Sequence, residues 1–250
     1  MNRIDLWLAY YEEFAQESPH LLTLLSEEER AKSICFHFAD DRLRYIVTRA
    51  MLRTVLSRYA NVAPEEWTFE QNAYGRPSIH THLSERSGDL NFNLSHTRGL
   101  IALGVCRGFS VGVDVEHLER QPALAVAERF FSPKEAAELA ALAPELQARR
   151  FFEYWTLKES YIKAHGKGIA HTLDSFSFSF PSDSSLRLTV DPKLDDDAQR
   201  WRFWQYQPDG EHLLAICAER TRNPAPLLRL LRMQHLDAFE VLSRQPDRTS

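Results

Sequence analysis

The feature that most constrains the fold is a short strand-like segment with two acidic residues, followed about forty residues later by a long helical segment. In Gly-Val-Asp-Val-Glu at residues 112–116 the residues alternate, so Asp114 and Glu116 project from one face while the valines pack behind. In the helical segment Glu159 and Lys163 are four residues apart and share one side. Carboxylates on a strand that face a carboxylate and an ammonium on a helix suit a hard divalent cation bound to a phosphate ester.

The length and composition are those of a globular protein without a membrane span. The chain has 250 residues, 44% of them hydrophobic, which is enough for one large domain or two small ones. No apolar run reaches the length of a membrane span, and the polar start Met1-Asn2-Arg3 is not typical of a signal peptide. A net charge of −5 argues against a nucleic-acid binder. We therefore expect a cytoplasmic protein that binds neither nucleic acid nor membrane.

Two capping-box patterns suggest an internal repeat. Ser26-x-x-Glu29 and Ser132-x-x-Glu135 each precede a short helix, a break and a long helix, about a hundred residues apart. This favours two similar α+β halves that meet near residues 106–112. Strands are predicted over residues 4–9, 67–70, 90–94, 100–106, 110–116, 175–180, 186–190, 200–207 and 213–218. Helices are predicted over residues 26 to about 36, 40 to about 59, 122–130, 145–164 and 227–242, and another begins at residue 132. Asp40 or Asp41 would cap the second helix, and the helix over 145–164 would end near Gly166 and Gly168.

Four motifs in register carry a resemblance to a known family. They are Asn-Phe-Asn-Leu-Ser-His at 91–96, Gly-Val-Asp-Val-Glu at 112–116, Arg-Phe-Phe-Ser-Pro-Lys-Glu at 129–135 and Trp-Thr-Leu-Lys-Glu-Ser-Tyr-Ile-Lys at 155–163. Their order and spacing resemble the surfactin-type (Sfp-type) 4′-phosphopantetheinyl transferases, over about residues 20–180. Gly166-Lys167-Gly168 and the Leu-Asp-Ser-Phe at 173–176 fit the same pattern.

The resemblance implies a fold and an activity. The fold would be an α+β pseudo-dimer with the active site in the cleft between its halves, in a monomer. The halves would be residues 1–109 and 110–220, followed by a basic amphipathic tail over 221–250. The activity would be Mg²⁺-dependent transfer of the 4′-phosphopantetheine arm of coenzyme A to a serine of an apo acyl or peptidyl carrier protein. Adenosine 3′,5′-bisphosphate would leave. Carriers of fatty acid, polyketide and nonribosomal peptide synthesis all fit.

The resemblance also assigns the metal and pyrophosphate residues. Asp114, Glu116 and Glu159 correspond to the magnesium ligands. Glu159, or a metal-bound water, would take the proton from the carrier serine. Lys163 would face the departing charge of the leaving phosphate.

Two further residues keep an ordinary alternative beside the functional one. Lys158 corresponds to a second lysine at the pyrophosphate, and an exposed helical lysine is the lesser alternative. Glu135 corresponds to a glutamate near the reacting centre, but its place in the capping box with Ser132 explains it equally well.

The first half would recognise the cofactor. By resemblance, Ser95 and His96 approach a phosphate from a turn, and Arg44 with His96 binds the 3′-phosphate that marks coenzyme A. Lys32 corresponds to a further phosphate-binding lysine. Arg76 stands beside the adenine where the family has a lysine, so stacking on the base becomes possible.

Two rival functions and a docking hypothesis stay open. The chain could be a magnesium-dependent phosphohydrolase, or a non-catalytic coenzyme A binding or carrier-docking module. For a transferase, the acidic helix of the carrier would suit either the arginines of residues 42–58 or the basic tail around Arg229 and Arg232.

Overall fold

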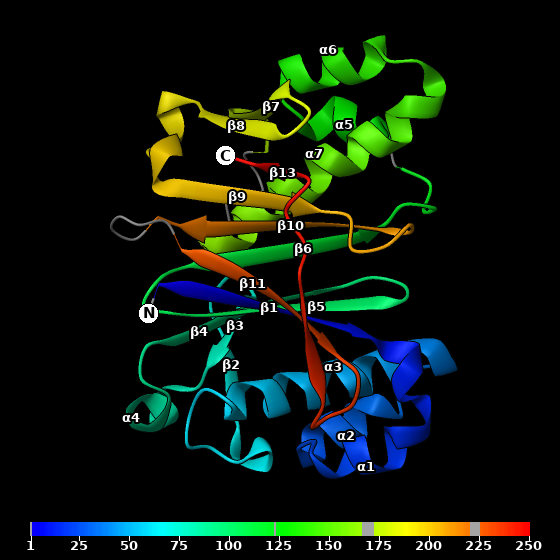
Figure 1. Cartoon of the computed structure of the whole chain (residues 1–250), viewed down its shortest axis with the longest axis vertical. Helices are drawn as coiled ribbons and strands as arrows, with labels where there is room; N and C mark the ends of the chain where they lie inside the picture. The colour runs from blue at the N-terminus through cyan, green and yellow to red at the C-terminus, as the bar shows by residue number, and fades with distance from the viewer. Residues whose placement is uncertain (1, 123, 167–172, 221–225) are drawn as a thin grey trace.

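The fold is α+β and consists of two β-sheets packed face to face, each covered by helices on its outer side (Figure 1). The computed structural model describes residues 2–122, 124–166, 173–220 and 226–250. Among these residues, no helix is both long and apolar enough to cross a membrane.

The first sheet is made mainly by the N-terminal part of the chain, and its strand order is β12-β11-β1-β5-β4. Its strands are β1 (Arg3–Tyr10), β4 (Leu90–His96), β5 (Leu100–Arg107), β11 (Leu227–Met233) and β12 (Phe239–Leu242). The helices of this part are α1 (Ser18–Thr23), α2 (Glu27–Ser33), α3 (Ala39–Ser57) and α4 (Ser84–Ser87), and a separate hairpin joins β2 (Phe69–Gln71) to β3 (Pro77–Ile79). Short 3₁₀ segments span Tyr11–Glu17, Pro64–Glu66 and Thr81–Leu83.

The second sheet has the order β6-β10-β9-β13-β8-β7. Its strands are β6 (Val111–His117), β7 (Phe176–Ser182), β8 (Ser185–Val190), β9 (Trp201–Tyr206), β10 (His212–Glu219) and β13 (Arg248–Thr249). The helices are α5 (Leu124–Phe130), α6 (Pro133–Ala141) and α7 (Pro144–His165), with 3₁₀ segments at Pro192–Leu194 and Ala198–Arg200.

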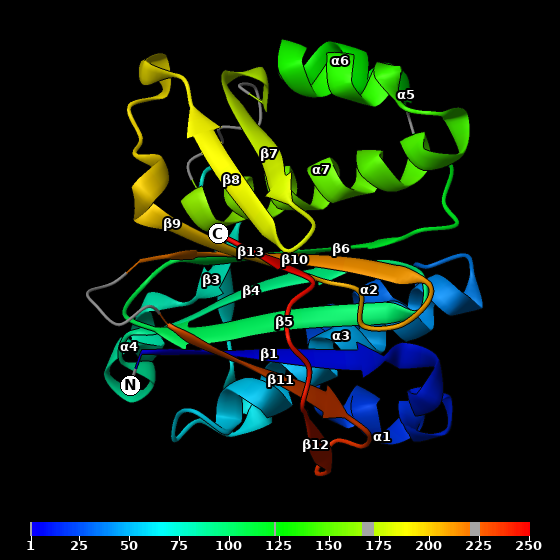
Figure 2. The same ribbon diagram turned by 45° about the horizontal axis from the view of Figure 1, so that its top comes forward.

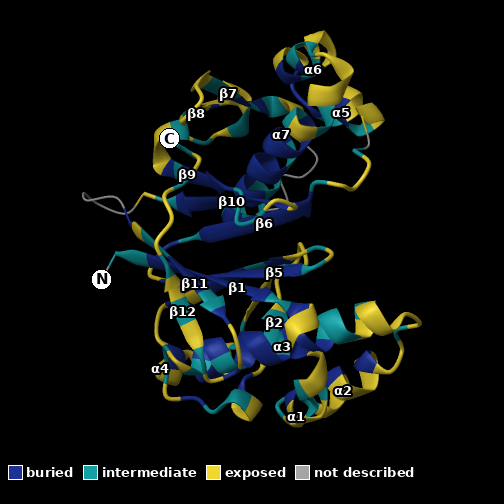
Figure 3. Ribbon diagram, turned by 45° about the vertical axis from the view of Figure 1, so that its right-hand side comes forward, coloured by how far each residue is buried: buried dark blue, intermediate teal, exposed yellow. Residues whose placement is uncertain are grey.

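The alternation of apolar residues explains the layers. Along β1, Leu6 and Leu8 face the second sheet, whereas Trp7 and Ala9 face the helices of the first half. Val113 on β6 joins the core between the sheets. These central strands are therefore buried on both faces, and the exposed residues gather on the outer helices and loops (Figure 3).

Both predicted capping boxes are present. The hydroxyl oxygens of Ser26 and Ser132 accept from the backbone N–H groups three residues later, and each glutamate accepts from its serine N–H in return. Gly166 ends α7 with a φ of 66°, in the left-handed region that favours glycine. Lys167 and Gly168 lie outside the described residues.

The predicted start of α3 is wrong. The helix begins at Ala39, and its N-cap is Phe38, which makes no side-chain capping bond. Asp40 and Asp41 lie in the first turn, where negative charge complements the helix dipole. Asp40 instead accepts a hydrogen bond from the hydroxyl of Tyr11.

The predicted tail helix is also wrong. Residues 227–233 form strand β11, which pairs parallel with β1, and the chain then crosses to the second sheet as β13 (Figure 2). An ion pair between distant parts of the chain joins this strand to β1. Both Arg229 Nε and Nη2 donate to the Asp5 carboxylate at 2.8 Å, and Asp5 is 1% exposed.

Some of the arginines expected to bind the carrier, both on α3 and near residue 230, instead contact other parts of this chain. Arg229 is committed to Asp5, and Arg232 donates to Glu13 at 2.7 Å. On α3, Arg53 is 2% exposed and donates to Glu29 and to the carbonyls of Pro64 and Trp67. These arginines stabilise the fold and are not a free basic surface.

Candidate active site

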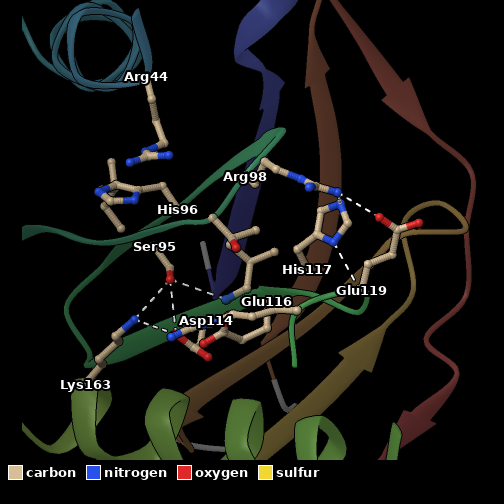
Figure 4. A pocket seen from close by; sticks show the side chains of 13 residues that line it. Arg44, Ser95, His96, Arg98, Asp114, Glu116, His117, Glu119 and Lys163 are labelled. Carbon is tan, nitrogen blue, oxygen red and sulfur yellow. Dashed lines mark hydrogen bonds and ion pairs between the residues drawn. The ribbon is translucent and has the colours of Figure 1, made fainter. Parts of the chain in front are cut away.

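A pocket of about 670 Å³ is lined by residues from both large β-sheets and from two helices. Residues from α3, β4, β6 and α7 form its walls, and Figure 4 shows their side chains. The lining residues are Arg44, Leu94, Ser95, His96, Thr97, Arg98, Asp114, Val115, Glu116, His117, Glu119, Arg120 and Lys163.

Three polar side chains from three elements meet at the floor of this pocket. Lys163 Nζ lies 2.7 Å from Asp114 Oδ1 and donates to Ser95 Oγ at 3.1 Å. Ser95 Oγ donates to the same Asp114 oxygen at 3.1 Å and accepts from the Val115 N–H. The end of β4 is thus joined to β6 and α7 at the position where the sequence places its phosphate-binding turn.

A glycine allows β6 to approach α7 closely enough for these contacts. A Cβ on Gly112 would lie 2.0 Å from the carbonyl oxygen of Ser160 and 2.3 Å from the backbone nitrogen of Ala164. Because Val113 packs toward the other sheet, the next residue, Asp114, points to the α7 side. The predicted split between carboxylate face and packed face is confirmed.

The charges of Asp114, Glu116 and Glu159 act on one another here, and the pKa values of the two glutamates are raised. Burial, aided by the charges of Asp114 and Glu116, raises the pKa of Glu159 to about 7. Burial and the Asp114 charge also raise the pKa of Glu116, although Arg120 lies 3.2 Å from that carboxylate. The second oxygen of Asp114, Oδ2, is buried and accepts no hydrogen bond from any described residue. This excess of negative charge is what a bound cation would relieve.

The side chains are not arranged as a closed metal site. Within the described residues, no group of three or more His, Cys, Asp or Glu side chains is placed so that it could hold a metal ion. Lys163 supplies the positive charge next to Asp114 instead. The donor set nevertheless fits a hard cation in its chemistry, since all three groups are carboxylates and one oxygen is free.

Arg44 and His96 lie side by side at the upper wall of the pocket (Figure 4). Arg44 forms an ion pair with Asp41, one turn earlier on α3. The His96 ring is open to solvent on one side, but the pocket walls remove much of its hydration. That burial, together with the charges of Arg44 and Lys163, lowers the pKa of His96. A neutral imidazole beside two cations suits an anionic ligand.

Lys158 and Glu135 do not reach this pocket. The Lys158 ammonium is fully buried, lies 2.8 Å from Glu135 Oε2, and donates to the carbonyls of Leu173 and Phe176 at 2.7 Å. Burial lowers the pKa of Lys158. The alternative of an exposed helical lysine is wrong, because this side of α7 packs onto β7. The pyrophosphate contact of Lys158 stays a prediction. Glu135 combines its capping role with this ion pair.

Lys32 and Arg76 also lie apart from the main pocket. Lys32 borders a neighbouring hollow of about 700 Å³ between α2, α3 and β2, and its ammonium lies 5.6 Å from the Tyr45 ring centroid. Arg76 donates to the carbonyls of Ala164 and Val111, and so links the β2–β3 hairpin to α7 and β6. Its guanidinium is used within the fold.

The sequence did not predict several of the residues that line the pocket. Arg98 donates to Glu119 and lies 2.9 Å from His117 Nε2, which places three unpredicted side chains along one edge. Arg120 forms an ion pair with Glu116 at 3.2 Å, and the sequence does not signal it because Glu116 lies on a strand and not on a helix. No local pattern signals His117, because its position follows from how the two sheets pack.

Comparison with known proteins agrees with the motifs. A sequence profile described as "4'-phosphopantetheinyl transferase superfamily" matches residues 110–217, and one described as "4'-phosphopantetheinyl transferase, N-terminal" matches residues 7–106. The 4'-phosphopantetheinyl transferase HetI of Nostoc sp. is 31% identical over 86% of this chain and 87% of its own length. The chain belongs to the Sfp-type 4′-phosphopantetheinyl transferases.

Other members of the family are equally similar. A 4'-phosphopantetheinyl transferase of Bacillus subtilis is 31% identical over 82% of this chain and 86% of its own. The 4'-phosphopantetheinyl transferase Sfp of Bacillus subtilis strain 168 is 29% identical over 81% of this chain and 86% of its own. The similarity extends over both halves, so membership in this enzyme family does not depend on the motifs alone.

Proposed function

We propose that this chain transfers the 4′-phosphopantetheine arm of coenzyme A to a serine of an apo acyl or peptidyl carrier protein and releases adenosine 3′,5′-bisphosphate. The observation that carries the proposal is the pocket itself. Its floor holds Asp114 and Lys163, its upper wall holds Arg44 and His96, and the relatives that cover most of the chain are phosphopantetheinyl transferases.

In this proposal, cationic side chains on two walls of the pocket bind different phosphates of coenzyme A. Arg44 and His96 bind the 3′-phosphate of coenzyme A, since a guanidinium fork matches a phosphate dianion. Lys163, whose side chain is 26% exposed, faces the pyrophosphate and stabilises the charge that develops on the leaving phosphate. Ser95 contributes through its contacts with both Asp114 and Lys163.

Asp114, Glu116 and Glu159 would hold Mg²⁺. The support is the free, buried Oδ2 of Asp114 and the raised pKa values of the two glutamates. When bound, the ion would neutralise the pyrophosphate and polarise the bond to be broken. Glu159 is also the proposed general base, since its carboxyl would be ionised with the cation bound and could accept a proton from the carrier serine. Direct proton transfer to Glu159 and transfer through water both fit.

The architecture proposed from the sequence has three parts. Residues 1–109 and 110–220 are the main parts of two halves of a pseudo-dimer with the site in the cleft between them. The segment predicted as a tail instead adds β11 and β12 to the first sheet and β13 to the second. Because one chain lines both walls of the pocket, we propose that a cytoplasmic monomer is the active form. Lys32 and Arg76 remain proposed contacts to the phosphate and adenine, and both would need to turn from their present partners.

The decisive experiment incubates the protein with coenzyme A, Mg²⁺ and several apo carrier proteins, and follows the mass of each carrier. A gain of one phosphopantetheine arm is expected with at least one carrier. Glu159→Ala should abolish the gain, whereas Glu145→Ala, an exposed position on the same helix, should not. Cleavage of coenzyme A without any carrier would favour a phosphohydrolase. Binding of coenzyme A without transfer or cleavage would favour a non-catalytic module.

A further inference from the structure

A buried histidine on β10 reaches the turn that follows His96. His212, at the start of β10, is 2% exposed, and its Nε2 lies 2.7 Å from the carbonyl oxygen of Arg98. Its Nδ1 lies 2.8 Å from Asp209 Oδ2. The hydroxyl of Tyr10 on β1 donates to the same Asp209 oxygen at 2.7 Å. A chain of hydrogen bonds therefore runs from the first half, through Asp209 and His212, back to the first half.

Both ring nitrogens of His212 face acceptors, with Asp209 at Nδ1 and the Arg98 carbonyl at Nε2. Burial alone would lower the pKa of His212, but the hydrogen bonds to Asp209 and to the Arg98 carbonyl outweigh it and raise that pKa. Only the protonated ring can donate to both acceptors at once, and in that form its hydrogen bond to the Arg98 carbonyl is charge-assisted.

The His212 ring also packs against the apex of the turn. Gly99 has a φ of 81°, and a Cβ there would lie 3.1 Å from both Cε1 and Nε2 of His212. The turn between β4 and β5 is thus shaped to accept this imidazole. His96 stands between two anchors, with Ser95 bound to Asp114 on one side and the Arg98 carbonyl bound to His212 on the other.

We infer that His212, oriented by Asp209, is a positioning residue that fixes the turn at residues 97–99 and thereby holds His96 beside Arg44. This inference rests on the proposed role of His96 in binding the 3′-phosphate. Its effect is specific: loss of His212 loosens the site for the 3′-phosphate and leaves the floor of the pocket, at Asp114 and Lys163, intact.

Calorimetric binding of coenzyme A and of 3′-dephospho-coenzyme A tests the inference without a carrier. His212→Ala should weaken binding of coenzyme A about tenfold and change binding of 3′-dephospho-coenzyme A less than about twofold. His212→Gln keeps an N–H that can donate to the Arg98 carbonyl, and should recover most of the loss. Asp209→Asn retains the ring but removes its charged partner, and should give an intermediate loss.

The control is His235→Ala. His235 lies 2.7 Å from Glu17 on another face, so it also loses an ion pair but should not change the preference between the two ligands. Thermal unfolding of each variant shows whether it is folded. If His212→Ala does not fold, the binding data of His212→Gln and Asp209→Asn test the inference in its place. Equal weakening of both ligands, or no weakening, overturns the inference while transfer by the unaltered protein still supports the proposed function. Failure of that transfer overturns the proposed function separately.

Discussion

The ammonium of Lys163 on α7 lies 2.7 Å from Oδ1 of Asp114 on β6, and Ser95 Oγ lies 3.1 Å from both atoms. This arrangement neutralises one oxygen of Asp114 and leaves the other, Oδ2, buried without a donor among the described residues. The two oxygens of one carboxylate are therefore in different states, and only one is satisfied by the protein.

Asp114→Asn tests that difference. The amide oxygen can still accept from Lys163 and Ser95, so the melting temperature should stay within about 4 °C of the unaltered protein. Transfer activity should fall about 100-fold or more, because a neutral amide oxygen holds a divalent cation more weakly than a carboxylate does and leaves the charge of the pyrophosphate less well balanced. Activity measured against Mg²⁺ concentration checks this. An unchanged half-saturating concentration of Mg²⁺ would remove Asp114 from the proposed ligands.

Glu159→Gln should stabilise the protein in a way that depends on pH. The pKa of Glu159 is raised in the folded state to about 7 from 4.5. Between these values the unfolded chain ionises this group while the folded protein keeps the proton, so rising pH favours unfolding, and the penalty is complete above about pH 7.

The glutamine variant removes this penalty. In a chelating buffer its free energy of unfolding should exceed that of the unaltered protein by on the order of 1–2 kcal/mol at pH 8, and by much less at pH 5. Activity should be lost at both pH values. Denaturant unfolding at the two pH values gives the comparison, with Glu145→Gln as control. A difference that does not change with pH would be inconsistent with a raised pKa of Glu159.

Gly112→Ala should separate β6 from α7. Its Cβ would lie 2.0 Å from the carbonyl of Ser160, so the strand or the helix must shift, at a cost of about 3 kcal/mol in unfolding free energy. The shift would also displace Asp114 and Glu116, and activity should fall more than the folded fraction. Gly210→Ala is the matched control, because no atom lies within 4 Å of a Cβ built there. If both variants are equally stable, the close approach of β6 and α7 is not a constraint.

The Lys158–Glu135 pair should behave as part of the core. Removal of one partner, in Lys158→Met or Glu135→Gln, leaves a buried charge or a buried polar group without its partner and should cost about 3–5 kcal/mol. The double variant should recover part of this loss, which a double-mutant cycle measures. The KM for coenzyme A of the folded fraction should not change. If Lys158→Met instead raises the KM for coenzyme A and leaves the stability unchanged, Lys158 contacts the pyrophosphate.

Local patterns were sufficient where an element's contacts are close in sequence. The two capping boxes, the strand at 112–116 and the helix with its end at Gly166 all depend on neighbours within a few residues, and all are confirmed. The side of β6 that carries Asp114 and Glu116 also followed from alternation alone.

Contacts between distant residues account for the errors. The segment at 227–233 fits a helix by periodicity, but Asp5, more than two hundred residues earlier, draws Arg229 into the first sheet. Lys158 and Lys163 belong to one helix and one motif, yet one faces the core and the other the pocket. Only the packing of α7 against its neighbours distinguishes them.

The position of β11 has a consequence for synthesis of the protein on the ribosome. β1 is made first, but its parallel partner β11 comes from residues 227–233, near the end of the chain. One edge of β1 therefore stays unpaired until residues 227–233 have emerged. Strands β6 to β10 of the second sheet are made before that point, so the first sheet cannot be completed before most of the second has been synthesised.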